Sequence, residues 1–441
     1  MNQSCKVLSN KMLSDKMLSD KMPSDKMLSD KVIFRPSKAC GTIAAPPSKS
    51  MAHRHLVCAA LAGGESIVRN IELSEDIRAT IGCVGNLGRK VDYSDGVVSV
   101  FGPEVSGTDS RAEVPVFRCN ESGSTLRFFI PIALALFDRS RFEGSEVLMQ
   151  RPLSVYEDIC RNQGISFRRV SGVSGNCCGL ELSGRLHGGA FEIPADISSQ
   201  FISGLLFALP LLKEDSTITL AGKIESRPYI DMTIKVLGQH GIDVKWTDER
   251  TLSVPGSRKY CSGDFTVEGD WSNAAFLDAL GYVGGRVEVT GLNCDSLQGD
   301  RVYPDFFGAL QKGFAEIDIS DCPDLGPVLM ALAACFHGAS FIGTRRLKIK
   351  ESDRGKAMCS ELSRFGVGTV LEENRIVVQG GGLSKPAEAV LSHNDHRIAM
   401  ALSVVLSKTG GVLEGASAVN KSFPDFFSRL KSLGVDFDYV D

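Results

Sequence analysis

The chain has 441 residues, of which 43% are hydrophobic and 23% are charged, and its formal net charge is −4. This length allows two or more domains with full cores, and the composition is typical of a globular protein. The small net charge excludes a broad basic face for nucleic acid, and no apolar run reaches the ~18 residues of a membrane span. The thirteen cysteines are scattered, without zinc spacing or a signal peptide, so we expect reduced thiols and a cytoplasmic location.

Residues 1–31 repeat the pentad KMLSD, once in the form KMPSD. A five-residue step turns each Met-Leu pair to a different side of a helix, so no apolar stripe forms. Pro23 would also interrupt a helix. We therefore predict a disordered low-complexity tail over residues 1–31, and its regular aspartates argue against an organelle transit peptide.

From residue 32 onward, an amphipathic helix ends six times at a glycine and runs into a short strand. These glycines are Gly88, Gly164, Gly241, Gly313, Gly366 and Gly434. Each is expected to cap its helix in a left-handed backbone conformation. Their spacing of roughly 50 to 80 residues suits a βαβ-type unit, so we predict an α/β fold with six units in two groups of three. A dinucleotide fold or P-loop is unsupported, because neither glycine motif is present.

Several predicted helices of the first half begin with polar or cationic side chains. PPSKSMAHR places Lys49, Ser50 and Arg54 in the first turns of one helix, and Arg151 stands before another. Other candidates at helix starts are Gly123 in ESGSTLR, Ser198, Ser199 and Gln200 in SSQ, and Ser226 and Tyr229 in SRPY. Free backbone N–H groups and the macrodipole favour anions at such positions. If these helix starts face one way, they form a funnel for a polyanion.

Charged residues gather in the second half. Asp324 precedes a smooth apolar helix, where it is either an N-cap or a general base at a cleft. Lys350, Glu351 and Arg354 follow in RRLKIKESDR, which is either a solvated charged loop or part of a site.

Two further cationic segments precede helices in the second half. His396 and Arg397 open a helix that quickly becomes apolar, although helix starts attract carboxylates more than cations. Such a conflict between local preference and sequence is typical of a functional site. Lys421, in NKSFPDFF, adds another cation before another helix.

In this order, the segments resemble the family of 5-enolpyruvylshikimate-3-phosphate (EPSP) synthases, which are enolpyruvyl transferases. The resemblance runs from about residue 32 to the C-terminus and rests on PPSKSMAHR, ESGSTLRF, SSQF, SRPYIDMT, VEGDWSNAAF, QGD, CPD, KIKESDR, NDHRIAMA and KSFPDFF. It implies a two-domain inside-out α/β barrel built from six βαβαββ-type repeats, three per domain. We place the first domain at residues 48–266 and the second at residues 32–47 plus 267–441.

The resemblance also implies a reaction without metal or organic cofactor, in a monomer. The enolpyruvyl group of phosphoenolpyruvate is transferred to the 5-hydroxyl group of shikimate 3-phosphate, phosphate is released, and the product continues through the shikimate pathway. Each substrate carries a phosphate and a carboxylate, so the site needs many cations, best of all arginines that bind in bidentate fashion.

The family pattern assigns roles to residues of this chain. Shikimate 3-phosphate would be held by Lys49, Ser50, Arg54, Ser198, Ser199, Gln200, Ser226, Tyr229, Asp324 and Lys350. Phosphoenolpyruvate would be held by Lys49, Gly123, Arg151, Gln200, Arg354, Arg397 and Lys421. The base at the 5-hydroxyl group would be Asp324 and the acid at the methylene carbon Glu351, with Lys49 and His396 as further candidates.

Two positions depart from the family pattern, and two alternatives stay open. Glu121 and Arg346 replace asparagines, whereas Gly123 leaves room for glyphosate, so we expect inhibition competitive with phosphoenolpyruvate. One alternative is the UDP-N-acetylglucosamine enolpyruvyl transferase, whose reactive cysteine is missing from GSEVLMQRPL. The other is a non-catalytic phosphate-ligand binding protein on the same scaffold, in which we would expect one of Asp324, Glu351 and Lys49 to be lost.

Overall fold

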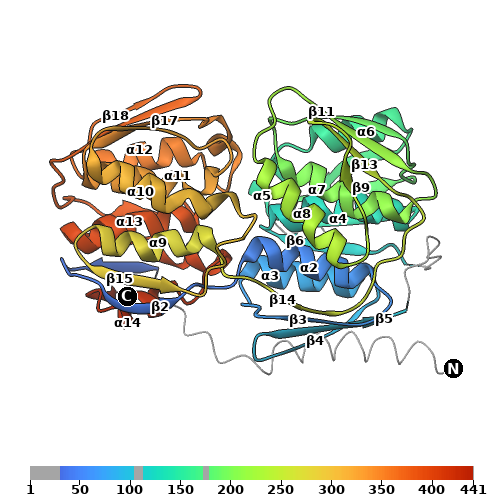
Figure 1. Ribbon diagram of the computed structural model, residues 1–441, viewed down its shortest axis with the longest axis horizontal. Helices are drawn as coiled ribbons and strands as arrows, with labels where there is room; N and C mark the ends of the chain where they lie inside the picture. The colour runs from blue at the N-terminus through green and yellow to red at the C-terminus, as the bar shows by residue number, and fades with distance from the viewer. Residues whose placement is uncertain (1–29, 104–112, 172–177, 441) are drawn as a thin grey trace.

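The computed structural model describes residues 30–103, 113–171 and 178–440. Two α/β bodies stand side by side in Figure 1. We call residues 48–266 the first half and residues 30–47 plus 267–440 the second half. The predicted tail, residues 1–31, lies outside the described residues except for its last two. Lys31, the last of them, is already the first residue of strand β1. Among the described residues, no helix has the length and apolar character needed to cross a membrane.

In the first half, helices alternate with short strands. Its helices are α2 (Lys49–Leu61), α3 (Glu75–Asn86), α4 (Gly123–Leu136), α5 (Glu146–Gln150), α6 (Ser154–Asn162), α7 (Ser199–Ala208) and α8 (Arg227–Gln239), with a 3-10 turn η1 (Leu209–Leu211). Its strands are β3 (Gly64–Arg69), β4 (Lys90–Ser94), β5 (Val97–Gly102), β6 (Val116–Asn120), β7 (Arg139–Gly144), β8 (Ser166–Ser171), β9 (Cys178–Ser183), β10 (Ala190–Pro194), β11 (Ser216–Ala221), β12 (Lys245–Trp246), β13 (Thr251–Val254) and β14 (Asp264–Thr266).

The second half has the same alternation and more 3-10 turns. Its helices are α9 (Trp271–Tyr282), α10 (Tyr303–Lys312), α11 (Gly326–Cys335), α12 (Arg354–Arg364), α13 (His396–Thr409) and α14 (Phe426–Ser432), and its 3-10 turns are η2 (Gly299–Val302), η3 (Pro323–Leu325), η4 (Arg345–Ile349) and η5 (Ala416–Lys421). Its strands are β1 (Lys31–Phe34), β2 (Cys40–Ala44), β15 (Arg286–Thr290), β16 (Ala315–Asp318), β17 (Gly338–Ile342), β18 (Thr369–Leu371), β19 (Arg375–Gln379), β20 (Val390–Leu391), β21 (Gly411–Glu414) and β22 (Phe437–Val440).

The described strands form six small sheets, and five of them share one arrangement. In each, the first two strands are parallel to each other, and each of the next two is antiparallel to its neighbour. In the sheet β6-β7-β9-β8, for example, β6 and β7 are parallel, and the pairs β7-β9 and β9-β8 are antiparallel. The sheets β10-β11-β13-β12 and β16-β17-β19-β18 repeat this order within one stretch of chain. The sixth sheet consists of the parallel pair β15-β2. The α/β class predicted from the sequence is thus confirmed, and the six sheets are consistent with six repeats.

The predicted glycine caps are confirmed at five of six positions. The glycines after α3, α6, α8, α12 and α14 have φ values between 69° and 83°, the left-handed region that glycine adopts without a steric cost. The prediction was wrong for Gly313, whose φ is 167°. The chain leaves α10 directly into extended backbone there, because β16 begins two residues later at Ala315.

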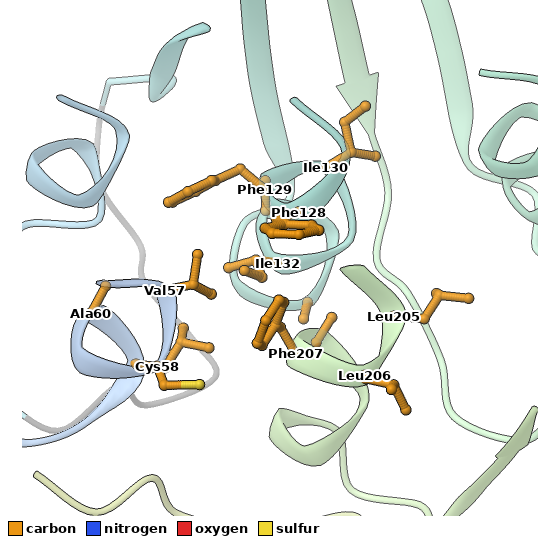
Figure 2. Close-up of a cluster of buried hydrophobic side chains, with 14 of the residues drawn as sticks. Val57, Cys58, Ala60, Phe128, Phe129, Ile130, Ile132, Leu205, Leu206 and Phe207 are labelled. Carbon is orange, nitrogen blue, oxygen red and sulfur yellow. The ribbon is translucent and has the colours of Figure 1, made fainter. Parts of the chain in front are cut away.

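Each half encloses its own apolar core. In the first half, helices α2, α4 and α7 meet around side chains such as Val57, Phe128 and Phe207 (Figure 2). The Phe128 and Phe207 rings lie edge to face with centroids 5.2 Å apart. Almost every residue of α4 and α7 is buried, as expected for helices that are apolar on all sides. Their polar N-terminal turns therefore stand at fixed positions on a rigid base.

The chain crosses between the halves twice, and the crossings touch. Ser48 N–H donates to Glu268 O and Asp270 N–H donates to Pro46 O, each over 2.8 Å. β1 pairs with β21 and β22. The blue strand β2 pairs with β15 in the body formed by the second half in Figure 1. The N-terminal strands thus belong to sheets of the second half, and the two crossings form a double connection.

Candidate active site

A pocket between the halves brings together residues from distant parts of the chain. Of the residues predicted from sequence, it is lined by Lys49, Ser50, Arg54, Gly123, Arg151, Ser198, Ser199, Gln200, Ser226, Tyr229, Asp324, Lys350, Glu351, Arg354, His396 and Arg397. Lys421 is not among the lining residues, although it lies near them. The pocket also contains charged residues for which no role was predicted: Asp76, Arg127, Asp270, Asp300 and Arg346.

Lys49 is the first residue of helix α2. Ser48 is the N-cap and its hydroxyl oxygen accepts from Met51 N–H, so the helix begins at the predicted residue. The Lys49 ammonium group lies 2.8 Å from an Asp76 carboxylate oxygen, and the Lys49 backbone N–H donates to Asp270 over 3.1 Å. The α2 N-terminus is therefore tied to both halves.

Arg54 is buried one turn further along α2 and bonds only to neutral oxygens. It donates to Thr233 Oγ1 over 2.9 Å, to Ser50 O over 2.7 Å and to Tyr229 O over 2.9 Å. Burial lowers its pKa to about 10, which leaves the guanidinium charged at neutral pH. This charge is available to an anionic ligand, since none of these partners is a carboxylate.

The N-terminus of α4 lies beside two more arginines. Arg127 donates to Gln200 Oε1 over 2.7 Å and lies over the Phe201 ring. A Cβ atom on Gly123 would come within 2.9 Å of an Arg151 guanidinium nitrogen, so the glycine allows this close approach. Burial first, and then the Arg151 charge, lower the pKa of Arg127 to about 10. Arg127 ends the motif ESGSTLR, which is the feature that could have marked it.

Helices α7 and α8 add hydroxyl groups to the same wall. Ser198 caps α7 and accepts from Gln200 N–H, whereas Ser226 precedes α8 with a left-handed φ of 57°. The buried Arg346 guanidinium of the second half donates to Ser226 Oγ, and Ser226 Oγ donates in turn to Ser320 O over 3.3 Å. The helix starts of the first half therefore face the second half across the pocket.

Asp324 is the centre of a cluster of cations. Its carboxylate lies 3.1 Å from Lys350, 2.8 Å from Arg354 and 3.1 Å from Arg397. Burial favours the protonated carboxyl, but the three cations outweigh it and hold the pKa of Asp324 well below its usual value. The N-cap alternative was wrong, because Asp324 lies inside η3 and its side chain points to these cations instead of capping a backbone N–H group.

Arg354 joins three carboxylates although its side chain is only 1% exposed. Besides Asp324, it donates to Glu351 over 2.5 Å and to Asp395 over 2.8 Å. The solvated-loop alternative for this segment was therefore wrong. Burial raises the pKa of Glu351, but the charges of Arg354 foremost and then of Arg151 bring it well below its usual value. Both predicted proton-transfer carboxylates are thus ionised at neutral pH in this arrangement.

His396 opens helix α13 beneath the same pocket. Asp395 caps this helix and accepts from Arg397 N–H over 2.9 Å, which explains how two cationic residues are tolerated at the helix start. The His396 ring is buried and neither of its nitrogens has a hydrogen-bond partner. Burial, then Lys49 and Arg397, lower the pKa of His396 well below its usual value, so the imidazole is neutral.

Lys421 lies at the pocket's edge and connects the two halves. Its ammonium group forms an ion pair with Glu121 and donates to Asn394 O over 2.7 Å. Glu121, which the sequence marked as a departure from the family pattern, is thus paired with a cation. In the described ranges, no group of three or more His, Cys, Asp or Glu side chains could hold a metal ion.

Similar solved structures include enolpyruvyl transferases. EPSP synthase from Acinetobacter baumannii matches with a TM-score of 0.74 at 23% identity, over 93% of this chain and 100% of that chain. The enolpyruvyl transferase NikO from Streptomyces tendae matches with a TM-score of 0.73 at 14% identity, over 93% and 98%. The fold is therefore that of the enolpyruvyl transferase class.

Sequence comparison identifies the family within this class. The family model for EPSP synthase (3-phosphoshikimate 1-carboxyvinyltransferase) matches residues 34–430. A 3-phosphoshikimate 1-carboxyvinyltransferase from Clostridium kluyveri is 39% identical over 92% of this chain and 98% of the relative. One from Clostridium beijerinckii is 39% identical over 91% and 97%. The chain belongs to the EPSP synthase family and has its activity, a step of the shikimate pathway, as its motifs predicted.

Proposed function

We propose that shikimate 3-phosphate and phosphoenolpyruvate bind together in the pocket between the halves, and that the enolpyruvyl group passes to the 5-hydroxyl group there. One observation carries the proposal: cations of both halves line one cavity. Lys49 and Arg54 come from the first half, and Lys350, Arg354 and Arg397 come from the second. Had these groups lain on separate surfaces, two doubly anionic molecules could not meet between them.

Shikimate 3-phosphate takes the side formed by α2, α7 and α8. Arg54 offers a charge without a carboxylate partner, and Ser198 and Ser226 offer hydroxyl groups at helix starts. The remaining proposed ligands of this substrate are Lys49, Ser50, Ser199, Gln200, Tyr229, Asp324 and Lys350, all of which line the pocket. Helix N-termini and a guanidinium group suit its phosphate, and side chains at the opposite wall suit its hydroxyl groups.

Phosphoenolpyruvate takes the space next to Gly123. Arg151 of the first half lies beside this space, and Arg354 and Arg397 of the second half line the same pocket, which supports a clamp of arginines on its phosphate and carboxylate. Lys49 and Gln200 line the pocket and are proposed to contact both substrates, and Lys421 would reach phosphoenolpyruvate from η5.

Asp324 acts as the base at the 5-hydroxyl group. Its low pKa keeps it ionised, and the substrate anions would draw Lys350, Arg354 and Arg397 away from it. Removing these cationic partners raises the pKa of a buried carboxylate, so Asp324 becomes a stronger base when both substrates are bound.

Glu351 acts as the acid at the methylene carbon by the same change in its surroundings. Arg354 holds its pKa down in the protein alone. Once phosphoenolpyruvate binds Arg354 and adds negative charge, burial dominates and Glu351 takes up a proton. Protonation of the methylene carbon and attack by the 5-hydroxyl oxygen give the tetrahedral intermediate. Return of a proton from the new methyl group to Glu351 then accompanies loss of phosphate.

We further propose the domains as residues 48–266 and residues 32–47 plus 267–441, each with three βαβαββ-type repeats of an inside-out α/β barrel. The two separate cores and the paired crossings support this division. A monomer is supported by the pocket, which one chain completes by itself. A cytoplasmic location is supported by the cysteines, because all eleven of them within the described ranges are free.

A coupled assay of phosphate release tests the proposal. The purified chain is mixed with phosphoenolpyruvate alone, with phosphoenolpyruvate and shikimate 3-phosphate, and with phosphoenolpyruvate and UDP-N-acetylglucosamine. We expect phosphate only in the second mixture. Release in the third mixture would establish the UDP-N-acetylglucosamine transferase, and binding of shikimate 3-phosphate without release in any mixture would establish the non-catalytic binding protein.

A further inference from the structure

Asp300 is a buried carboxyl group of the pocket that the proposed mechanism does not use. It lies in η2, is 3% exposed and lines the cavity close to Asp324. No lysine or arginine of the described residues forms an ion pair with it, whereas Asp324 has three such partners. Its Oδ1 atom is buried without a hydrogen-bond partner. A buried carboxylate in this position would be costly unless it binds a proton.

Tyr229 connects Asp300 to Asp324. Its hydroxyl oxygen lies 3.0 Å from Asp300 Oδ2 and 3.4 Å from Asp324 Oδ2. The hydroxyl group has one hydrogen for these two acceptors. With a proton on Asp300, Asp300 donates to Tyr229 and Tyr229 donates to Asp324. With Asp300 ionised, Tyr229 donates to Asp300 and leaves Asp324 without this bond.

The charges around Asp300 place the proton there rather than on Asp324. The groups that face it are Asp324 from η3, Asp270 from the start of α9, Tyr229 from α8 and Arg397 from α13. Burial first, and then the Asp324 charge, raise the pKa of Asp300 to about 7, while the pKa of Asp324 is held well below its usual value. Bound substrates raise the pKa of Asp324, and the transfer requires only that it stays below that of Asp300; a proton that arrives at Asp324 then moves to the more basic group.

We propose that Asp300 is a positioning residue that receives, through the Tyr229 hydroxyl group, the proton that Asp324 takes from the substrate. The inference rests on the proposed function. The O–H bond of the 5-hydroxyl group breaks as its oxygen bonds to phosphoenolpyruvate, and Asp324 takes the proton. Asp324 then passes a proton to the Tyr229 oxygen while Tyr229 passes its own to Asp300, so Asp324 is again ionised. One proton moves, and no electrons are transferred.

The test compares kcat of the wild type with that of Asp300→Asn from about pH 5.5 to 9. Asparagine resembles protonated Asp300 and cannot receive a proton. We expect the wild type to be at least roughly tenfold faster near pH 9, where Asp300 is ionised, and the ratio to fall towards one near pH 5.5. Ionisation of the substrates affects both proteins equally and cancels in the ratio. A ratio that does not change with pH would overturn the proposal.

Two further variants separate this role from a structural one. Asp278 is half-buried, is hydrogen-bonded to Tyr303 and has a pKa raised by partial burial to about 6, but it does not line the pocket. The ratio of wild type to Asp278→Asn should therefore not vary with pH. Tyr229→Phe removes the bridge, so adding Asp300→Asn to it should have no further effect on kcat.

The experiment distinguishes a failure of the role of Asp300 from a failure of the proposed function. If Asp300→Asn does not fold, Tyr229→Phe alone should show the same loss towards high pH, and a loss of equal size at every pH would overturn the inference. If the wild type releases no phosphate from the two substrates, the proposed function fails. Wild-type turnover with a flat ratio would reject the role of Asp300 alone.

Discussion

The two halves supply cations to the pocket in different ways. In the first half, Arg54 and Arg127 are held by hydroxyl, carbonyl and amide oxygens. In the second half, Lys350, Arg354 and Arg397 all pair with Asp324. A charge held by neutral oxygens is ready for an incoming anion, whereas a charge already paired must exchange one anion for another. The first half is therefore built to receive the substrates and the second half to respond to them.

This difference links substrate binding to proton transfer. Anions that bind Arg54 or Arg127 displace no carboxylate, although Lys49 of the same half is paired with Asp76. Anions that bind the second half compete with Asp324 and Glu351 for the same cations, and they raise the pKa of both carboxyl groups. In the proposed mechanism, proton transfer therefore depends on ligands reaching the ion pairs of the second half.

The largest effect is expected from Asp324→Asn in the second half. The amide keeps the shape of the side chain but cannot take the proton from the 5-hydroxyl group, so kcat should fall by roughly 10²- to 10⁴-fold. Steady-state phosphate release measures this loss, and the thermal midpoint controls for unfolding. A raised KM with kcat preserved would reduce Asp324 to a binding residue and remove the contrast between the halves.

A smaller effect is expected from Gly123→Ala in the first half. The added methyl group would lie 2.9 Å from an Arg151 guanidinium nitrogen and displace it. We expect KM for phosphoenolpyruvate to rise about tenfold, or roughly 1.4 kcal/mol, with KM for shikimate 3-phosphate nearly unchanged. Inhibition by glyphosate, which should compete with phosphoenolpyruvate, should weaken in parallel. Gly82→Ala, on helix α3 with open space around its Cβ position, is the matched control.

Breaking the ion pair between Glu121 and Lys421, which connects the halves, should change KM for phosphoenolpyruvate a few-fold. Glu121→Gln frees Lys421 from a carboxylate that is about one third exposed, and such pairs contribute up to about 1 kcal/mol. KM for phosphoenolpyruvate should fall by less than about fivefold, because Lys421 no longer has to exchange anions. Glu146→Gln, at an exposed acid on α5, should leave it unchanged. A rise in KM would mean that Glu121 instead holds Lys421 in place.

A separate effect, on stability rather than on catalysis, is expected at the junction of the halves. Burial first, and then its hydrogen bond to Asp425, raise the pKa of Glu72 to about 9 from the usual 4.5. Between these values the unfolded chain loses the proton more readily than the folded chain, so folding is disfavoured as pH rises. Glu72→Gln should therefore have a higher thermal midpoint than the wild type at pH 8 and an equal one near pH 4.5. Equal midpoints at both pH values would show that Glu72 is not buried at the junction.

Most residues that line the pocket could be predicted from the sequence, but the hydrogen bonds and ion pairs between them could not. The α2 start at Lys49 and the caps at Ser198 and Asp395 follow local rules of helix termini, which one sequence carries. The N-cap alternative for Asp324 failed because its three cations follow η4 or lie at the starts of α12 and α13, which no local pattern connects. Arg127 and Asp300 lay in motifs that were recognised, but their partners are tertiary neighbours.

In the proposed site, cations of both halves hold the same phosphoenolpyruvate molecule. KM for phosphoenolpyruvate in Arg151→Lys and in Arg397→Lys tests it most directly, because lysine keeps the charge but loses the bidentate geometry. We expect each variant to raise this KM about tenfold or more, while KM for shikimate 3-phosphate stays within about twofold. A rise in only one of the two variants would contradict it.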